Sequence, residues 1–105
     1  MMNSQKLAAK AKFFSGFADQ TRLSIVETLA DGPKNVGEIA KATGQPQPNV
    51  SNHLACLLDC GLVTRKRNGK CNLYSISEKD IEHLLAVAEK IVAKHYGRLA
   101  ACTRQ

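Results

Sequence analysis

The middle of the chain places two short helical segments one after the other, with a glycine turn between them. Asn35 and Glu38 have the spacing of a capping box, and the helix that they begin should end at Gly44. Pro46 suits the first turn of the next helix, which we expect to run to about Cys60. Two short helices joined by a tight glycine turn are typical of a helix-turn-helix unit.

A β-hairpin signal follows this unit directly. Residues 62–67 and 71–76 are predicted to form two strands around the dipeptide Asn68-Gly69, which is typical of tight hairpin turns. A helix-turn-helix unit followed by a two-stranded wing predicts a mostly α-helical, winged helix-turn-helix fold.

Further helical patterns lie on both sides of this region. Before it, apolar residues recur at helical spacing over the first 18 residues, and Asp19 is placed to cap a helix over residues 20–30. After it, Ser77 and Asp80 suggest the start of a last helix with one apolar stripe. The stripe consists of Ile81, Leu84, Leu85, Ala88, Ile91, Val92 and His95. A chain of 105 residues fits one domain.

The composition points to a polyanionic partner. Fifteen Lys and Arg residues against nine Asp and Glu give a formal charge of +6, which favours nucleic acid or an anionic membrane surface. Aromatic residues make up only 5% of the chain, which argues against a stacking platform for single strands. No apolar run approaches the length of a membrane span or of a signal-peptide core, so we expect a cytoplasmic protein with reduced thiols.

The second helix of the helix-turn-helix unit is the one that enters the major groove of DNA in such folds. An apolar stripe of Val50, Leu54, Leu57 and Leu58 should face the core. The polar residues of this helix are then candidates for contact with bases or phosphates, the alternative being a solvated surface. The candidates are Gln47, Asn49, Ser51, Asn52 and His53.

The wing adds four cations near its tip, namely Arg65, Lys66, Arg67 and Lys70. A charge run is often only a solvated loop, but cations on a rigid turn beside a recognition helix favour contact with phosphates or the minor groove. Double-stranded DNA is therefore the expected partner.

Cys56 and Cys60 lie one helical turn apart on the recognition helix, with Cβ atoms expected about 5–6 Å apart. Two thiolates at this separation can bind one soft ion. Both positions lie away from the centre of the apolar stripe, so neither is expected to pack in the core. Cys71 opens the second wing strand, and we interpret it as a structural residue.

Several segments together resemble the ArsR/SmtB family of metal-responsive repressors, in the same order along nearly the whole chain. They are residues 17–26, 36–40, 47–54, 61–63 and 69–76. The resemblance implies a homodimer, paired through its first and last helices, that leaves operator DNA when metal binds. It gives one domain over 1–105 with five parts. These are a dimerisation helix (1–18), the helix-turn-helix (35–60), the wing (62–76), a second dimerisation helix (77–96) and a tail (97–105).

The spacing of Cys56 and Cys60, together with a distal Cys102, resembles the CmtR-type cadmium/lead sensors of this family. In those sensors the tail cysteine comes from the other subunit. The resemblance therefore implies a Cd(II) or Pb(II) inducer, held by Cys56 and Cys60 of one protomer and Cys102 of the partner subunit. Zn(II) and As(III) are the other ions considered, and no organic cofactor is expected.

Alternative functions remain open from the sequence. The same fold and thiols would suit an As(III) or Sb(III) sensor, or a repressor that responds to thiol oxidation or persulfides. A thiol oxidoreductase is disfavoured, because the chain has neither a Cys-x-x-Cys motif nor a βαβ pattern. A membrane-surface binder is disfavoured because the cations do not share one long amphipathic face. We thus expect neither an enzyme nor a membrane protein.

Overall fold

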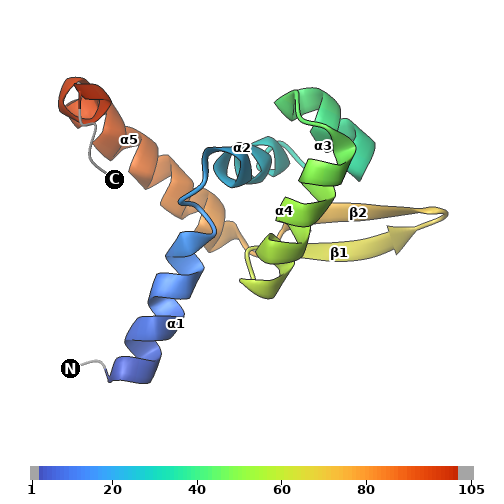
Figure 1. Cartoon of the computed structure of the whole chain (residues 1–105), viewed down its shortest axis with the longest axis horizontal. Helices are drawn as coiled ribbons and strands as arrows, with labels where there is room; N and C mark the ends of the chain where they lie inside the picture. The colour runs from blue at the N-terminus through green and yellow to red at the C-terminus, as the bar shows by residue number, and fades with distance from the viewer. Residues whose placement is uncertain (1–2, 102–105) are drawn as a thin grey trace.

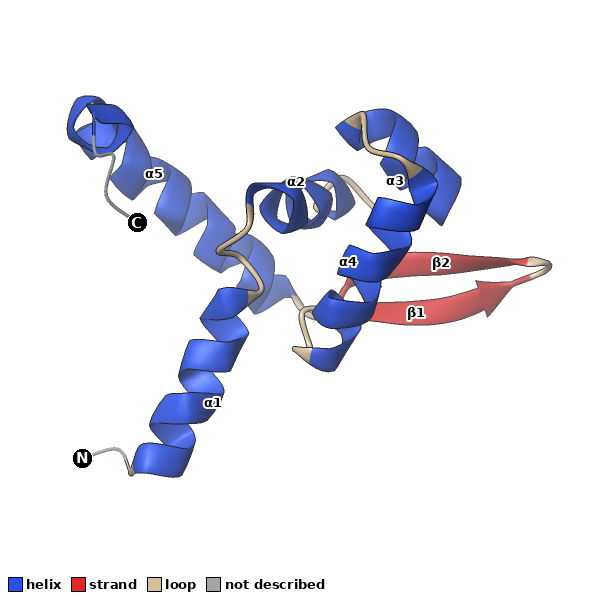
Figure 2. Cartoon of the chain, in the orientation of Figure 1, coloured by secondary structure: helices blue, strands red, loops and turns tan. Residues whose placement is uncertain are grey.

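The computed structural model describes residues 3–101 and has the predicted winged helix-turn-helix fold (Figures 1 and 2). Five helices and a two-stranded antiparallel sheet follow one another along the described chain. They are α1 (Ser4–Ser15), α2 (Gln20–Leu29), α3 (Val36–Thr43), α4 (Gln47–Asp59), β1 (Val63–Asn68), β2 (Cys71–Ile76) and α5 (Lys79–Ala101).

Local signals in the sequence set the helix boundaries around the helix-turn-helix unit. The Asp19 side chain caps α2 by accepting a hydrogen bond from the Arg22 N–H at 3.0 Å. Asn35 and Glu38 form the predicted capping box of α3, with bonds of 2.8 and 2.9 Å. Gly44 ends α3 in the left-handed conformation at φ 71°, which glycine adopts without steric cost. These predictions are confirmed.

The hydrophobic core lies where α2, α3 and α4 meet the base of the hairpin and the start of α5. Its buried residues are Ile25, Val26, Leu29, Ile39, Val50, Leu54, Leu57, Leu62, Val63, Tyr74 and Ile81. The predicted stripe on α4 is therefore confirmed, with Leu58 half-buried at its edge. Because the stripe is buried, the opposite face of α4 is turned outward.

The hairpin turn differs by one residue from the prediction. Asn68 pairs with Cys71, so the two central residues of the turn are Gly69 and Lys70. Gly69 has φ 65°, and no non-glycine residue of the described chain has positive φ. Glycine at the first central position with an ordinary second residue is the pattern of a type II′ turn. The prediction that Asn68-Gly69 forms the turn was wrong by this one step.

The wing is anchored at its base by a bridge between Lys34 and Tyr74. The backbone N–H of each residue donates to the carbonyl of the other, at 3.0 and 2.9 Å. Tyr74 is itself buried in the core. The hairpin is thereby held against the loop between α2 and α3, and its far end extends away from the helices (Figure 1).

The last helix differs from the prediction at both ends. Ser77 does not cap it, because the Ser77 hydroxyl donates to the Gly61 carbonyl at 2.7 Å and the helix begins at Lys79. At the other end α5 continues to Ala101, with non-helical dihedral angles at His95. Residues 97–101, predicted as part of a tail, are helical because Gly97 does not take the left-handed conformation that ends helices.

Helices α1 and α5 leave large apolar side chains exposed, and α1 has no buried residue of its own. The exposed residues are Leu7, Phe14, Val87, Ile91, Val92, Tyr96 and Leu99. Beside them lies an apolar hollow of about 190 Å³, lined by Phe14, Phe17, Leu23, Leu84, Leu85 and Ala88. Both helices extend away from the wing (Figure 1). Across the described residues, no helix has both the length and the apolar character needed to cross a membrane.

Candidate DNA interface and cysteine site

The outward face of α4 presents a row of polar side chains. Gln47, Asn49, Ser51 and Asn52 are exposed, as predicted for residues that face away from the core. Pro46 is the N-cap rather than a helical residue, and within the described chain no side chain caps the first turn of α4. The backbone N–H groups of this first turn are therefore available to an external acceptor.

His53 differs from the other four polar residues of α4. It is half-buried, and its Nε2 atom lies 4.0 Å from Oδ2 of Asp19, the N-cap of α2. The pKa of Asp19 is lowered from its ordinary value, mainly by the hydrogen bond from the Arg22 backbone N–H and further by the charges of His53 and Arg22. Sequence reasoning missed this contact, because no local signal connects residues so far apart in the chain.

The four wing cations are all exposed. Arg65 and Lys66 lie along β1, opposite Tyr74 and Leu73 of β2. Arg67 lies further along β1, where its Nε donates to the Gly69 carbonyl at 3.0 Å, and Lys70 lies in the turn itself. Across residues 3–101 none of these cations is in an ion pair with an acidic side chain. The wing therefore carries uncompensated positive charge.

The two α4 cysteines have different environments. Cys56 is exposed, as predicted. Cys60 is half-buried and packs against the core, so the prediction that it avoids the core was wrong. The physical reason is local: Cys60 is the C-cap of α4 and leads through Gly61, at φ 76°, to the buried Leu62. The two residues remain one helical turn apart, with the Cys60 N–H donating to the Cys56 carbonyl at 3.0 Å.

A complete metal site does not form within the part of the chain that the structure describes. No group of three or more His, Cys, Asp or Glu side chains lies close enough together there to hold an ion. Cys102, the predicted third ligand, lies outside the described residues. The thiols of Cys56 and Cys60 are of a chemical kind that binds soft ions, but they provide two donors only.

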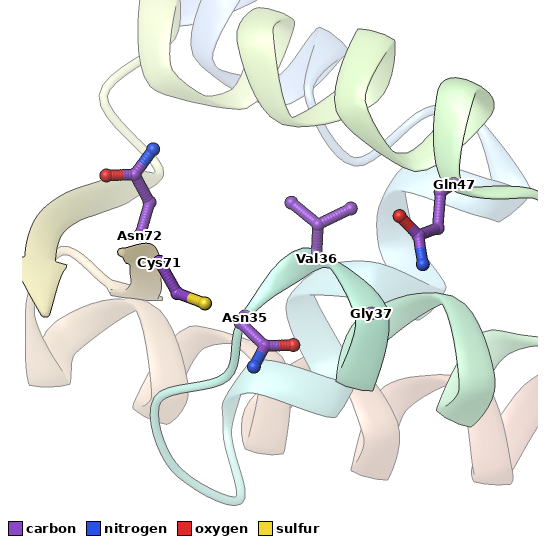
Figure 3. Close-up of a pocket in the computed structure, with 6 residues that line it drawn as sticks. All are labelled: Asn35, Val36, Gly37, Gln47, Cys71 and Asn72. Atoms are coloured by element: carbon purple, nitrogen blue, oxygen red, sulfur yellow. The ribbon is translucent and has the colours of Figure 1, made fainter. Parts of the chain in front are cut away.

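Cys71 lies apart from this pair, at the start of β2. It is exposed, and its interpretation as a structural residue stays a prediction. The thiol opens into a hollow of about 370 Å³ at the N-terminal ends of α3 and α4 (Figure 3). The hollow is lined by Asn35, Val36, Gly37, Gln47, Cys71 and Asn72. Cys71 is exposed because it belongs to the last residue pair of the hairpin, next to the turn.

Comparison with known proteins agrees with this geometry. Residues 19–65 match the family model described as "Bacterial regulatory protein, arsR family". The chain is 37% identical to a probable mercury resistance operon repressor of Streptomyces lividans, over 90% of this chain and 75% of that protein. It is 34% identical to the transcriptional regulator CmtR of Mycobacterium bovis, over 81% of this chain and 72% of that protein.

Solved structures show the same fold. A homodimeric winged helix-turn-helix DNA-binding domain from Mycobacterium bovis superposes with a TM-score of 0.81 at 31% identity, covering 90% of this chain and 91% of that one. The cadmium sensor CmtR of Mycobacterium tuberculosis superposes with a TM-score of 0.65 at 36% identity, covering 72% and 79%. These relatives are DNA-binding regulators rather than enzymes.

Proposed function

The chain belongs to the arsR family of bacterial regulatory proteins, and from this premise we propose that it is a homodimeric repressor released from operator DNA by a soft metal ion. The observation that carries the proposal is the position of Cys56, an exposed thiol on the same helix as the outward-facing amides. An ion bound at Cys56 cannot leave the DNA-facing helix unaffected.

The proposed DNA interface combines the outward face of α4 with the wing. It consists of Gln47, Asn49, Ser51, Asn52, His53, Arg65, Lys66, Arg67 and Lys70. Asparagine and glutamine amides can pair with adenine edges in the major groove. The uncapped first turn of α4 and the unpaired wing cations suit phosphate oxygens. The charge of +6 is consistent with this partner.

The proposed dimer pairs α1 and α5 with the same helices of a second copy. The exposed apolar residues of both helices form the face that such contact would cover. A structural relative with this fold is described as homodimeric. Pairing would place two recognition helices on one duplex, and these need to be about 34–36 Å apart to meet successive major grooves.

The proposed metal site consists of Cys56 and Cys60 of one protomer and Cys102 of the partner subunit. Thiolate ligands select soft or borderline ions. Cd(II) or Pb(II) is the proposed inducer, and the named relatives include a cadmium sensor and a probable mercury resistance repressor. A site shared between subunits would favour one dimer geometry, and a geometry that mis-spaces the recognition helices lowers DNA affinity.

The test is a titration of Cd(II) into reduced protein bound to a fluorescent duplex, which the protein itself has selected from a random-sequence pool. We expect a sulfur-to-metal absorption band and a fall in anisotropy as DNA is released. The Cys56→Ser/Cys60→Ser variant should bind the duplex and lose both responses. Cys71→Ser is the matched control and should keep both.

Two results would contradict the proposal. A full absorption band in the Cys56→Ser/Cys60→Ser variant would exclude the proposed ligands. Equal DNA affinity of metal-loaded and metal-free dimers would exclude metal sensing. Competition with Pb(II), Hg(II), Zn(II), arsenite and antimonite then identifies the preferred ion, and release by oxidant or persulfide without metal would indicate a thiol-redox switch instead.

A further inference from the structure

Three helices are connected by a chain of polar contacts that runs from the junction of α1 and α2 to His53 of the recognition helix. The Arg22 guanidinium donates from Nη2 to the carbonyl of Ser15, the last residue of α1, at 3.1 Å. The Arg22 backbone N–H donates to Asp19 Oδ2 at 3.0 Å. The same carboxylate oxygen lies 4.0 Å from His53 Nε2 on α4. The contacts therefore connect the end of α1, the start of α2 and the recognition helix.

The charged surroundings of His53 make Asp19 its acidic partner. Helix α4 packs against α2, α3 and β1. From α2 come the Asp19 carboxylate and the Arg22 guanidinium, which both act on the contact. The charged residues of α3 are Glu38 and Lys41, and those of β1 are Arg65, Lys66 and Arg67. Within residues 3–101, Asp19 is the one acidic side chain within 4.0 Å of the His53 ring.

The side of α4 on which His53 lies separates it from the residues that face outward. Bases are contacted mainly by the N-terminal residues of a recognition helix. His53 lies in the second turn, on the side toward α2, with its side chain only 26% exposed. Contact with Asp19 therefore competes with an outward orientation of the imidazole.

We propose that His53 is a positioning residue, whose contact with Asp19 fixes the recognition helix against the junction of α1 and α2. The inference rests on the proposed DNA-binding function and gives His53 a different task from a phosphate or base contact. The contact is strongest when the imidazole is protonated, because the pair is then ionic. Since Arg22 continues the connection to Ser15, a movement of α1 also reaches α4 through Asp19.

The test compares four proteins: wild type, His53→Gln, Asp19→Asn and the double variant. Asparagine is as good an N-cap as aspartate, so Asp19→Asn removes the charge and keeps the cap of α2. Each single variant should weaken binding of the selected duplex by about two- to five-fold, the size expected for a partly exposed ion pair. The double variant should be no weaker than either single variant.

The salt dependence separates positioning from phosphate contact. Removing a phosphate contact lowers the slope of log affinity against log salt by about 0.9. We expect an unchanged slope for His53→Gln. His83→Gln, an exposed histidine of α5, is the matched control and should change neither affinity nor slope.

A lower slope for His53→Gln, or additive losses in the double variant, would overturn the proposal, since both indicate that His53 acts on DNA independently of Asp19. The same four proteins are also compared without DNA, by urea unfolding. Coupling between the two residues in the free energy of unfolding supports the contact, and its absence overturns the inference. Failure of every variant and of the wild type to bind DNA would count against the proposed function instead.

Discussion

Asp19 shows how one side chain connects local and tertiary structure. It caps α2 through the Arg22 N–H and faces His53 of α4. Both interactions favour the ionised carboxylate, and the pKa of Asp19 is accordingly lowered. A carboxylate with a lowered pKa in the folded state stabilises the fold above its unfolded-state pKa. That contribution is lost as the pH falls through the folded-state pKa.

We therefore predict that Asp19→Asn is less stable than wild type near neutral pH and that the difference shrinks in acid. Asparagine keeps the cap but cannot be protonated, so only the wild type loses a stabilising charge on acidification. Urea unfolding is measured for both proteins at about pH 7 and at about pH 3, which lies below the ordinary pKa of an aspartate side chain. A stability difference that is constant over this range would contradict the prediction.

Gly16 gives a second prediction at the scale of single residues. It is buried at the end of α1, and a Cβ atom added there would overlap the Leu62 side chain, which is fully buried. We expect Gly16→Ala to lower the free energy of unfolding by about 1–3 kcal/mol, the usual cost of overpacking. Gly97→Ala is the control, because its Cβ would meet open space on α5 and should stabilise the helix by about 0.5–1 kcal/mol.

The residues that could be predicted from the sequence are those whose surroundings are local. The caps at Asp19 and Asn35 depend on neighbours three residues away, and both were predicted. The burial of Cys60 depends on how the chain turns back at Gly61, and the neighbour of His53 comes from another helix. Helical angles alone carry no information about either, so the candidate site was only partly predictable.

At the scale of elements, the wing adds positive charge to the proposed DNA interface, whose other part is the outward face of α4. If Lys66 and Lys70 contact phosphates, each substitution by glutamine should lower the slope of log affinity against log salt by about 0.9. Binding should weaken about equally on all duplex sequences, because phosphates carry no base identity. Anisotropy titrations at several salt concentrations measure the slope.

Lys10→Gln is the matched control for the wing variants. Lys10 is an exposed lysine of α1, outside the proposed interface, and its removal should leave the slope unchanged. An equal fall in slope for Lys10→Gln would mean that the overall charge of the protein, rather than the wing, sets the salt dependence.

Elements were predictable in type and order, and their ends were less so. The type and order follow from helical apolar spacing, capping residues and the hairpin turn signal, and α4 buries the stripe that its spacing predicted. The start of α5 was wrong because a tertiary contact decided it, since Ser77 bonds to Gly61 instead of the helix. The end was wrong because Gly97, although glycine often ends helices, stays helical. The turn was displaced to Gly69-Lys70 because pairing extends one residue further, to Asn68 and Cys71.

At the scale of the whole molecule, the apolar surface of α1 and α5 is the feature that a single copy leaves unexplained. Both helices project away from the core, and seven large apolar side chains are at least 39% exposed, all of them on these two helices. Small domains bury too little of their surface to tolerate such exposure easily. A second copy of the chain covering this face removes the problem and creates the two-fold arrangement that a palindromic operator requires.

The dimer is tested by placing a charge in this face. Ile91 of α5 is 53% exposed and lies among the apolar residues that the proposed interface would cover. An unpaired carboxylate buried there costs about 3 kcal/mol or more. Ile91→Glu should thus raise the dimer dissociation constant by about 100-fold or more, as measured by sedimentation equilibrium. Ala93→Glu adds the same charge to an exposed position about 160° away around the helix and should leave the dimer intact.

Because α4 and the wing belong to one protomer, the Ile91→Glu monomer should keep its fold and its non-specific DNA binding. It should lose affinity for a duplex that carries two half-sites. An Ile91→Glu protein that remained dimeric would place the interface elsewhere, and the apolar face of α5 would then need a different occupant.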